Sequence, residues 1–317
     1  MAKYRHQLPQ MKGDIFLTDG GIETTLIFHK GLELPYFATF HLLHTSAGER
    51  HLREYFESYV AIAKTLGVGL ILESPTWRAN PDWAARLRYT HEALIFTQRK
   101  AIRLLQEIRE EHETPASPMV ISGCIGPRSD GYAPEIIMSQ AWAERYHRPQ
   151  VEAFAASKAD MICALTMGYA EEAAGIAVAA KTAGMPLAIS FTVETDGHLP
   201  SGQLLQDAVR QVDEVSDGHP SYYMINCAHP NHFKHVLTGD APWVKRIRGI
   251  RANASRASHA ELDEAKTLDM GNPKELGEDF ARLKHHLPHL NVLGGCCGTD
   301  HRHIAQIADA CKPLINI

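Results

Sequence analysis

The chain has 317 residues, of which 44% are hydrophobic and 22% charged, and its formal net charge is −5 at pH 7. This length allows one large barrel or two ordinary domains, and the composition is that of a soluble globular protein. The negative charge argues against nucleic acid or an anionic membrane as a partner. No apolar run approaches the roughly 20 residues of a membrane span, and the N-terminal segment has no signal-peptide pattern. We therefore expect a cytoplasmic protein whose six cysteines are reduced.

Short apolar runs alternate with longer amphipathic segments along the chain. The predicted strands are 14–18, 68–73, 119–124, 161–165, 187–192, 222–226, 246–251 and 291–294. The predicted helices are 49–66, 81–111, 140–156, 170–183, 202–215, 274–286 and 299–311, and residues 251–272 are expected to form an extended loop. This alternation predicts an α/β fold, a single-domain (β/α)8 TIM-type barrel over residues 1–317. A doubly wound open sheet shares the alternation, but no Gly-x-Gly-x-x-Gly follows the first strand.

Polar residues follow nearly every predicted strand, and in a barrel those positions form the active-site face. Any one of them could be an ordinary loop residue, but together they predict a polar pocket. In chain order they are Asp19, Gly20, Glu23, Glu73, Trp77, Tyr132, Thr166, Glu194, Cys227, Asn253, Cys296 and Cys297.

The sequence Gly294-Gly295-Cys296-Cys297-Gly298 ends the last strand. Neighbouring side chains of a regular strand point to opposite faces, so both sulfurs can reach one point only if the backbone turns there. Glycine permits such a turn. Because Cys227 ends another apolar run, three thiolates could converge on an open zinc site with a position left for water or a substrate.

Three other interpretations of these cysteines stay open. They could be small buried core residues, since free cysteine is often buried. They could form a closed structural zinc site, with His229 or His301 as the fourth ligand. A disulfide is the least favoured alternative, because nothing indicates an oxidising compartment.

With these motifs the chain resembles the zinc-dependent homocysteine S-methyltransferases, which include enzymes that use betaine or S-methylmethionine as donor. The resemblance covers residues 14–307. It rests on Asp19-Gly20-Gly21, Ser122-x-x-x-Gly126-Pro127, Ser190-Phe191-Thr192, Asn226-Cys227 and the Gly294–Gly298 sequence. It implies Zn²⁺ bound by Cys227, Cys296 and Cys297, an Asp19 that contacts the thiol substrate, and an Asn253 that corresponds to the family's asparagine in the seventh loop.

The end of the fourth strand departs from the family pattern. The family usually has a glutamate followed by threonine there, whereas this chain has Leu165 followed by Thr166. That glutamate is expected to hold the substrate ammonium, and an unpaired ammonium in a dry pocket is costly. Either Glu23, Glu73 or Glu194 takes over its role, or the acceptor is a thiol other than homocysteine.

The resemblance implies two small-molecule partners, a thiol and a cationic methyl donor, either a sulfonium or a quaternary ammonium compound. Aromatic side chains can hold such a cation, which makes Trp77 and Tyr132 candidates for donor binding, with plain packing as the alternative role. Two rival functions are a zinc-dependent barrel hydrolase and a non-catalytic zinc or redox sensor. The sulfur-rich ligand set counts against the hydrolase, whose chemistry favours histidine and carboxylate ligands.

Overall fold

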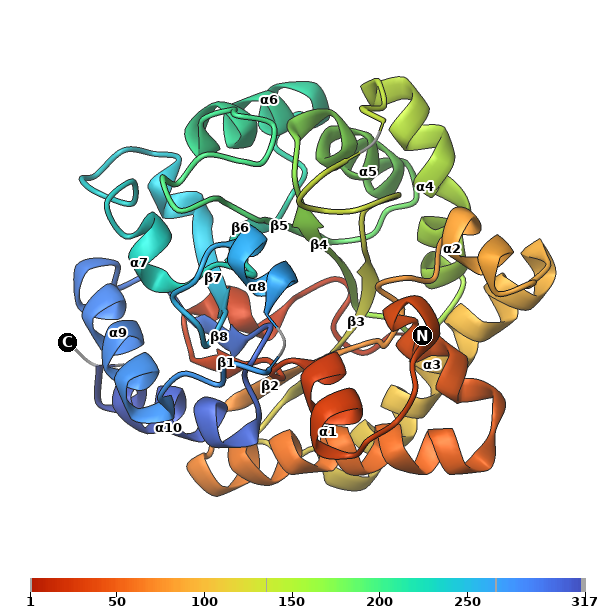
Figure 1. The fold of residues 1–317 in the computed structure, drawn as a ribbon, viewed down its shortest axis with the longest axis horizontal. Coiled ribbons are helices and arrows are strands. Elements are labelled where there is room, and N and C mark those ends of the chain that lie inside the picture. The colour runs from red at the N-terminus through yellow and green to blue at the C-terminus, as the bar shows by residue number, and fades with distance from the viewer. Residues whose placement is uncertain (1, 135, 266, 315–317) are drawn as a thin grey trace.

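In the computed structural model, which describes residues 2–134, 136–265 and 267–314, eight parallel strands close into a barrel (Figure 1). The strands are β1 Phe16–Leu17, β2 Gly69–Glu73, β3 Met119–Ile125, β4 Met161–Met167, β5 Leu187–Phe191, β6 Tyr222–Asn226, β7 Ile247–Ala252 and β8 Val292–Gly295. They pair in sequence order, and the pairing of Phe16 with Val292 closes the ring. The predicted (β/α)8 barrel is confirmed.

The long helices surround the strands in Figure 1, whereas α8 lies toward the middle of this view. The helices are α1 Ser46–Leu66, α2 Pro81–Arg86, α3 His91–His112, α4 Gln140–Ala155, α5 Ala170–Thr182, α6 Leu205–Ser216, α7 Pro230–Phe233, α8 His259–Glu264, α9 Pro273–His286 and α10 His301–Cys311. Within the part of the chain that the structure describes, none of these helices is long and apolar enough to cross a membrane.

Two predicted segments differ from the structure. The single helix predicted over 81–111 is broken in two, because Arg88 adopts a left-handed backbone (φ 61°) and Thr90 accepts a hydrogen bond from the N–H of Ala93 to start α3. The loop predicted over 251–272 contains α8, which begins with a capping box between Ser258 and Glu261. Neither the break at Arg88 nor the helix α8 changes the pattern of apolar residues, so the hydrophobic periodicity of the sequence did not reveal them.

The inside of the barrel is filled by alternate residues of the strands, as the two-residue period of a strand requires. Val120, Cys124, Met161 and Tyr222 belong to this inner cluster. The end of the barrel where the strands begin is covered by the N-terminal segment, where η1, a 3₁₀ turn at Pro9–Lys12, follows the buried Leu8 of the same cluster. The functional cavity therefore lies at the opposite end.

A buried ion pair ties α3 to the start of β4. Arg109 Nη1 lies 2.6 Å from Asp160 Oδ2, and the Asp160 side chain is fully buried. The Asp160 carboxylate also accepts hydrogen bonds from the N–H groups of Tyr4 (2.8 Å) and Ile121 (2.9 Å). One carboxylate therefore joins the N-terminal segment, α3 and two strands.

Candidate active site

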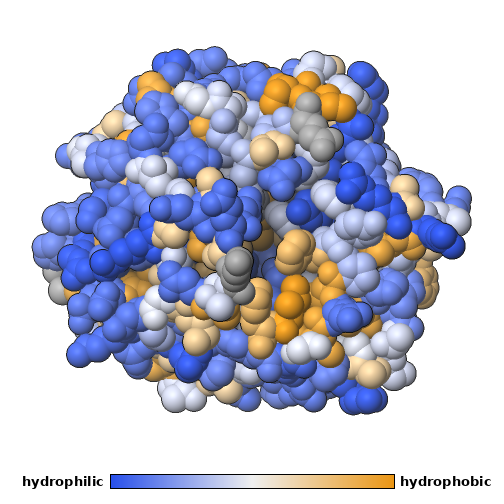
Figure 2. All heavy atoms as spheres, viewed as in Figure 1, coloured by the Kyte–Doolittle hydropathy of each residue, from blue (hydrophilic) through white to orange (hydrophobic). Residues whose placement is uncertain are grey.

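A cavity of about 360 Å³ opens at the carboxyl ends of the strands, and Figure 2 shows a hollow near the middle of this face with hydrophobic residues beside it. It brings together all but one of the site residues predicted from sequence. Those that line it are Asp19, Gly20, Glu23, Glu73, Trp77, Tyr132, Thr166, Cys227, Asn253, Cys296 and Cys297.

Glu194 is the exception, since it is not among the described residues that line the cavity. Its carboxylate lies 3.6 Å from Nδ1 of His259, which does line the cavity. Glu194 therefore lies behind a side chain of α8 rather than on the cavity wall.

The three cysteines converge, since their sulfur atoms all lie within 4.8 Å of one another. Cys227 and Cys296 are joined by a disulfide, with Cα atoms 5.3 Å apart, within the usual span of such a bond. At this pair the structure differs from the expectation of six reduced cysteines, because the ends of β6 and β8 bring the two sulfurs together. The bonded sulfurs cannot ligate a metal, so reduction has to precede metal binding.

The reduced cluster fits zinc. Three thiolate sulfurs form a soft donor set of the kind that zinc accepts, and they leave one tetrahedral position open. His229 and His301, the candidates for a fourth ligand, do not belong to the cluster. His229 instead caps α7 by accepting a hydrogen bond from the N–H of Asn231. The arrangement is that of an open site rather than a closed structural one.

Glycine permits the close approach of neighbouring side chains at the end of β8. A Cβ on Gly294 would lie 1.8 Å from Thr18 Oγ1, and one on Gly295 would lie 2.1 Å from Thr299 Oγ1. The turn after the cysteine pair has its positive φ at Gly298 (77°). Cys227 also adopts a left-handed backbone (φ 54°), a conformation that is uncommon outside glycine. Such strain persists where the surroundings enforce it, often at functional sites.

Asn253 holds the backbone of two cysteines at once. Its Nδ2 donates to the carbonyl of Cys227 (2.9 Å), and its Oδ1 accepts from the N–H of Cys297 (3.1 Å). The Cys227 carbonyl also lies 2.6 Å from Nε2 of His259. Both polar atoms of the Asn253 side chain are thus engaged with the cysteines, which favours a positioning role over the substrate contact predicted from sequence.

We expect Asn253→Ala to weaken metal affinity by about 10- to 100-fold, because residues that orient metal ligands carry effects of that size. Competition with a chromogenic chelator would measure the zinc dissociation constant of the reduced protein. Asn231→Ala is a matched control, since Asn231 Oδ1 binds only the exposed Lys234 within the described structure. An unchanged dissociation constant in Asn253→Ala would contradict the positioning role.

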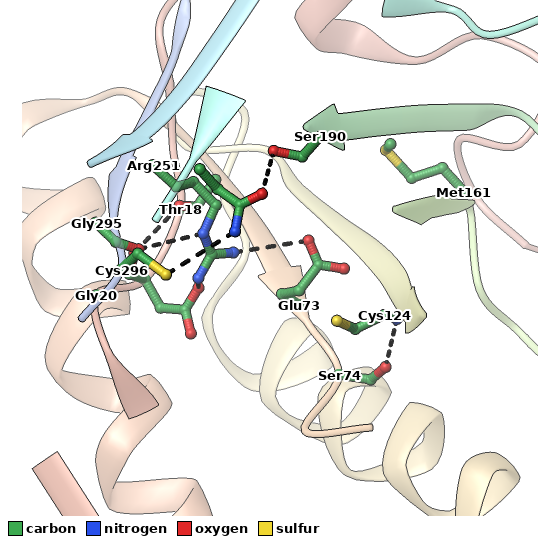
Figure 3. A network of polar contacts seen from close by, with 12 residues as sticks. Thr18, Gly20, Glu73, Ser74, Cys124, Met161, Ser190, Arg251, Gly295 and Cys296 are labelled. Atoms are coloured by element: carbon green, nitrogen blue, oxygen red, sulfur yellow. Dashed lines mark hydrogen bonds and ion pairs between the residues drawn. The ribbon is translucent and has the colours of Figure 1, made fainter. Parts of the chain in front are cut away.

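Thr166 belongs to a network that joins β4, β5 and β6. Asn226 Oδ1 accepts from the N–H of Thr166 (2.9 Å) and from the hydroxyl of Ser190 (2.7 Å), while Asn226 Nδ2 donates to Thr166 Oγ1 (2.8 Å). Asn226 Nδ2 also lies 4.0 Å from Cys296 Sγ, and Figure 3 shows the positions of Ser190 and Cys296. Thr166, with φ 63°, is held beside the cysteines by these bonds.

Two carboxyl groups on the cavity wall have raised pKa values. Burial raises the pKa of Glu73 to about 7, although the nearby Arg251 opposes the shift. Burial likewise raises the pKa of Glu23 to about 7. Both groups can therefore carry a proton near neutral pH, and the negative charge of the cavity depends on pH in that range.

The two aromatic candidates for donor binding line the cavity, but each already has a neighbour. The guanidinium of Arg78 lies 4.2 Å from the ring centroid of Trp77. The ring of Tyr132 packs on His259 with centroids 4.0 Å apart. A bound cation would have to share the face of Trp77 with Arg78, so a donor role for these rings stays a prediction.

Arg251 is the functional residue that the sequence analysis missed. It is the penultimate residue of β7, lines the cavity and is buried. Its Nη2 lies 2.7 Å from Asp19 Oδ1 (Figure 3 shows Arg251 beside Glu73 and Gly295). A signal was present, because an arginine in a strand that is buried on both faces is unusual.

Comparison with known proteins agrees with this geometry. A family model described as homocysteine S-methyltransferase matches residues 16–311. The metallated form of the homocysteine methyltransferase MmuM from Escherichia coli is 19% identical and has a TM-score of 0.75, over 96% of this chain and 99% of that chain. The oxidized form of MmuM gives the same identity and score, over 97% and 99%. These structures share the barrel fold, and because the family model spans most of the sequence, the chain belongs to the homocysteine S-methyltransferase family.

Proposed function

We propose that this thiol S-methyltransferase moves a methyl group from a cationic donor, a sulfonium or a quaternary ammonium compound, to the sulfur of homocysteine or a related thiol. We further propose that it does so with zinc held by Cys227, Cys296 and Cys297. The observation that carries the proposal is the convergence of three cysteine sulfurs within 4.8 Å of one another among the residues that line the cavity. A sulfur-only ligand set supports zinc and thiol chemistry over metal-bound hydroxide.

The thiol has to be deprotonated before it can attack. A free thiol has a pKa near 8.5, so only about 3% is thiolate at pH 7. Zinc, when bound, would supply the charge that keeps the acceptor sulfur deprotonated. The sulfur lone pair then forms the new S–C bond while the donor's C–S or C–N bond breaks. The electron pair of the broken bond stays on the leaving sulfide or amine, and the thiol proton passes to solvent.

The protein contributes position and charge. Asn253 and the Thr166 network fix the strand ends that carry the cysteines. Glu23 lines the cavity and lies close enough to Cys297 to raise the pKa of that thiol further, in addition to the larger effect of burial. We propose that Glu23 faces the donor cation, because a carboxylate beside the sulfur cluster attracts positive charge. In-line placement of sulfur, methyl and leaving group would supply much of the rate enhancement.

The proposal predicts loss of S-methylmethionine or betaine only when a thiol and zinc are both present. Reduced, zinc-loaded protein would be incubated with each donor, with and without thiol, and the donor and the methylated thiol quantified by mass spectrometry. A hydrolase would consume a donor without thiol, and a sensor would consume neither donor. Either result would contradict the proposed function. The cytoplasmic location and the absence of a nucleic-acid partner stay predictions.

A further inference from the structure

Arg251 and Glu73 place opposite charges side by side in the cavity, and neither side chain is fully hydrogen-bonded. Arg251 Nη1 lies 3.8 Å from Glu73 Oε2, which is too far for a hydrogen bond (Figure 3). Both residues line the cavity and are buried. Within the described part of the chain, Arg251 Nη1 donates no hydrogen bond and Glu73 Oε1 accepts none. Two neighbouring groups of opposite charge thus hold one buried donor and one buried acceptor for a ligand.

The rest of the Arg251 side chain is held in place by the protein. Its Nε donates to the carbonyl of Gly295 at 3.2 Å, and its Nη2 lies 2.7 Å from Asp19 Oδ1. Asp19 Oδ2 in turn accepts a hydrogen bond from the hydroxyl of Tyr55 at 2.7 Å. A guanidinium is permanently charged, and these contacts fix its position, so Arg251 Nη1 is a preorganised donor for an anionic group.

Glu73 has no positive charge at hydrogen-bonding distance. Burial raises the pKa of its carboxyl group to about 7, although the nearby Arg251 opposes the shift. The ionised carboxylate is therefore costly at this buried position, and a cation beside Glu73 Oε1 would stabilise it. Glu73 Oε1 is thus suited to a cationic group, as Arg251 Nη1 is suited to an anionic one.

Homocysteine, the acceptor that gives the family its name, carries both of the charges that these two groups lack. Its ammonium and its carboxylate are attached to the same carbon, so they fit two opposite protein charges that are neighbours. Buried ionic groups are tolerated when they are paired and hydrogen-bonded. Each end of the amino acid would find a counter-ion here, and each of the two protein groups would gain the hydrogen bond that it lacks.

The other candidates for the ammonium are less suited to it. Glu194 is not among the described residues that line the cavity. Glu23 lies close enough to Cys297 to raise the pKa of that thiol, and the proposed function assigns it to the donor. Leu165 is apolar and belongs to β4, which β3 separates from the β2 strand of Glu73. Of the three glutamates that the sequence leaves open, the geometry favours Glu73.

We propose that Glu73 and Arg251 bind the amino-acid end of homocysteine, the ammonium on Glu73 Oε1 and the carboxylate on Arg251 Nη1, while its sulfur reaches the cysteine cluster. This inference rests on the proposed function and assigns two residues to its acceptor. Together they select α-amino-acid thiols over thiols that lack either charge. The ammonium is then bound at the end of β2 and not at the end of β4, where Leu165 stands.

Three thiols that differ only in their charged groups test this assignment. They are L-homocysteine, 4-mercaptobutyrate, which lacks the ammonium, and 3-aminopropane-1-thiol, which lacks the carboxylate. Isothermal titration calorimetry would measure their dissociation constants on the reduced, zinc-loaded protein with no methyl donor present. We expect homocysteine to bind about tenfold more tightly than either of the others, because each missing charge leaves a buried protein group unpaired.

Glu73→Gln keeps the shape of the side chain and removes its negative charge. It should weaken the binding of homocysteine and of 3-aminopropane-1-thiol by about tenfold. The binding of 4-mercaptobutyrate should stay the same or become tighter, because this thiol has no ammonium to lose a partner. Glu194→Gln is the matched control, since this carboxylate lies off the cavity wall, and it should leave all three dissociation constants unchanged.

Arg251→Met should give the opposite pattern. We expect it to weaken the binding of homocysteine and of 4-mercaptobutyrate by about tenfold, while 3-aminopropane-1-thiol binds as before or more tightly. Circular dichroism and zinc content would report whether the variant is folded and metal-loaded. If it is not, Arg251→Lys, which keeps the positive charge but offers a single nitrogen, tests the same point and should weaken the same two thiols.

The outcomes separate this inference from the proposed function. Wild-type protein that binds homocysteine no more tightly than 4-mercaptobutyrate overturns the inference while methyl transfer stands. A Glu73→Gln protein that loses affinity for all three thiols by the same factor overturns the ammonium contact, because a merely structural role would produce that result. Thiols that bind in the expected order but are methylated by no onium donor would instead overturn the proposed function, since binding is measured without a donor.

Discussion

Replacing Cys227 with alanine is expected to remove most of the bound zinc and the methyltransferase activity. Cys227 contributes one of three sulfurs in the cluster. Two remaining sulfurs would leave two tetrahedral positions to water, whereas protein zinc sites normally keep at least three protein ligands. Zinc per chain, measured by plasma mass spectrometry on reduced protein after dialysis, should fall from near one to well below one half. The corresponding Cys296 and Cys297 variants should behave in the same way.

Cys311→Ala provides the control for this experiment. Cys311 is a free, buried cysteine at the end of α10 and lies outside the cluster. Its replacement tests whether loss of any buried thiol lowers zinc content, and we expect zinc content and activity close to wild type. Full zinc retention by Cys227→Ala would refute its role as a ligand.

The largest effect on stability is expected from Arg109→Met. This change leaves Asp160 buried without its counter-ion, although the N–H groups of Tyr4 and Ile121 still donate to it. Breaking a buried ion pair by removing one partner typically costs about 3–5 kcal/mol. Urea denaturation of the reduced, metal-free protein, followed by circular dichroism, would measure the free energy of unfolding.

Lys181→Met is the control, and it tests whether breaking an exposed ion pair costs as much unfolding free energy as breaking the buried pair of Arg109 and Asp160. Lys181 pairs with Asp217, and both side chains are largely exposed. Exposed pairs contribute little because water screens them and side-chain entropy opposes them, so the change in unfolding free energy should be much smaller than for Arg109→Met. Similar losses in the two variants would show that burial does not determine the effect.

The barrel could be predicted from sequence because each buried strand leaves a short apolar run. The predicted strand 222–226 coincides with β6, and each of the other predicted strands agrees with the observed one within two residues at each end. The break at Arg88 and the helix α8 were missed, since a left-handed residue or a capping box changes the backbone without changing the apolar pattern. Such features depend on local hydrogen bonds rather than on periodicity.

The sequence predicts those site residues whose positions follow from their place at the end of a strand. Asp19, Thr166 and the cysteines follow strands, so the closure of the barrel gathers them in one cavity. The pairing of Arg251 with Asp19 joins the ends of β7 and β1, which lie far apart in the sequence. The partner of a long side chain depends on its rotamer and on the side chains around it. The spacing of residues along the sequence predicts neither.

The packed inside of the barrel, to which Leu8 of the N-terminal cover belongs, has a kinetic consequence. Because side chains fill the barrel, both reactants and both products share the mouth at the carboxyl ends of the strands. Under the proposed function, the thiol and the donor have to occupy this one cavity together, so turnover would pass through a ternary complex. A product that stays in the cavity would then block the next pair of reactants.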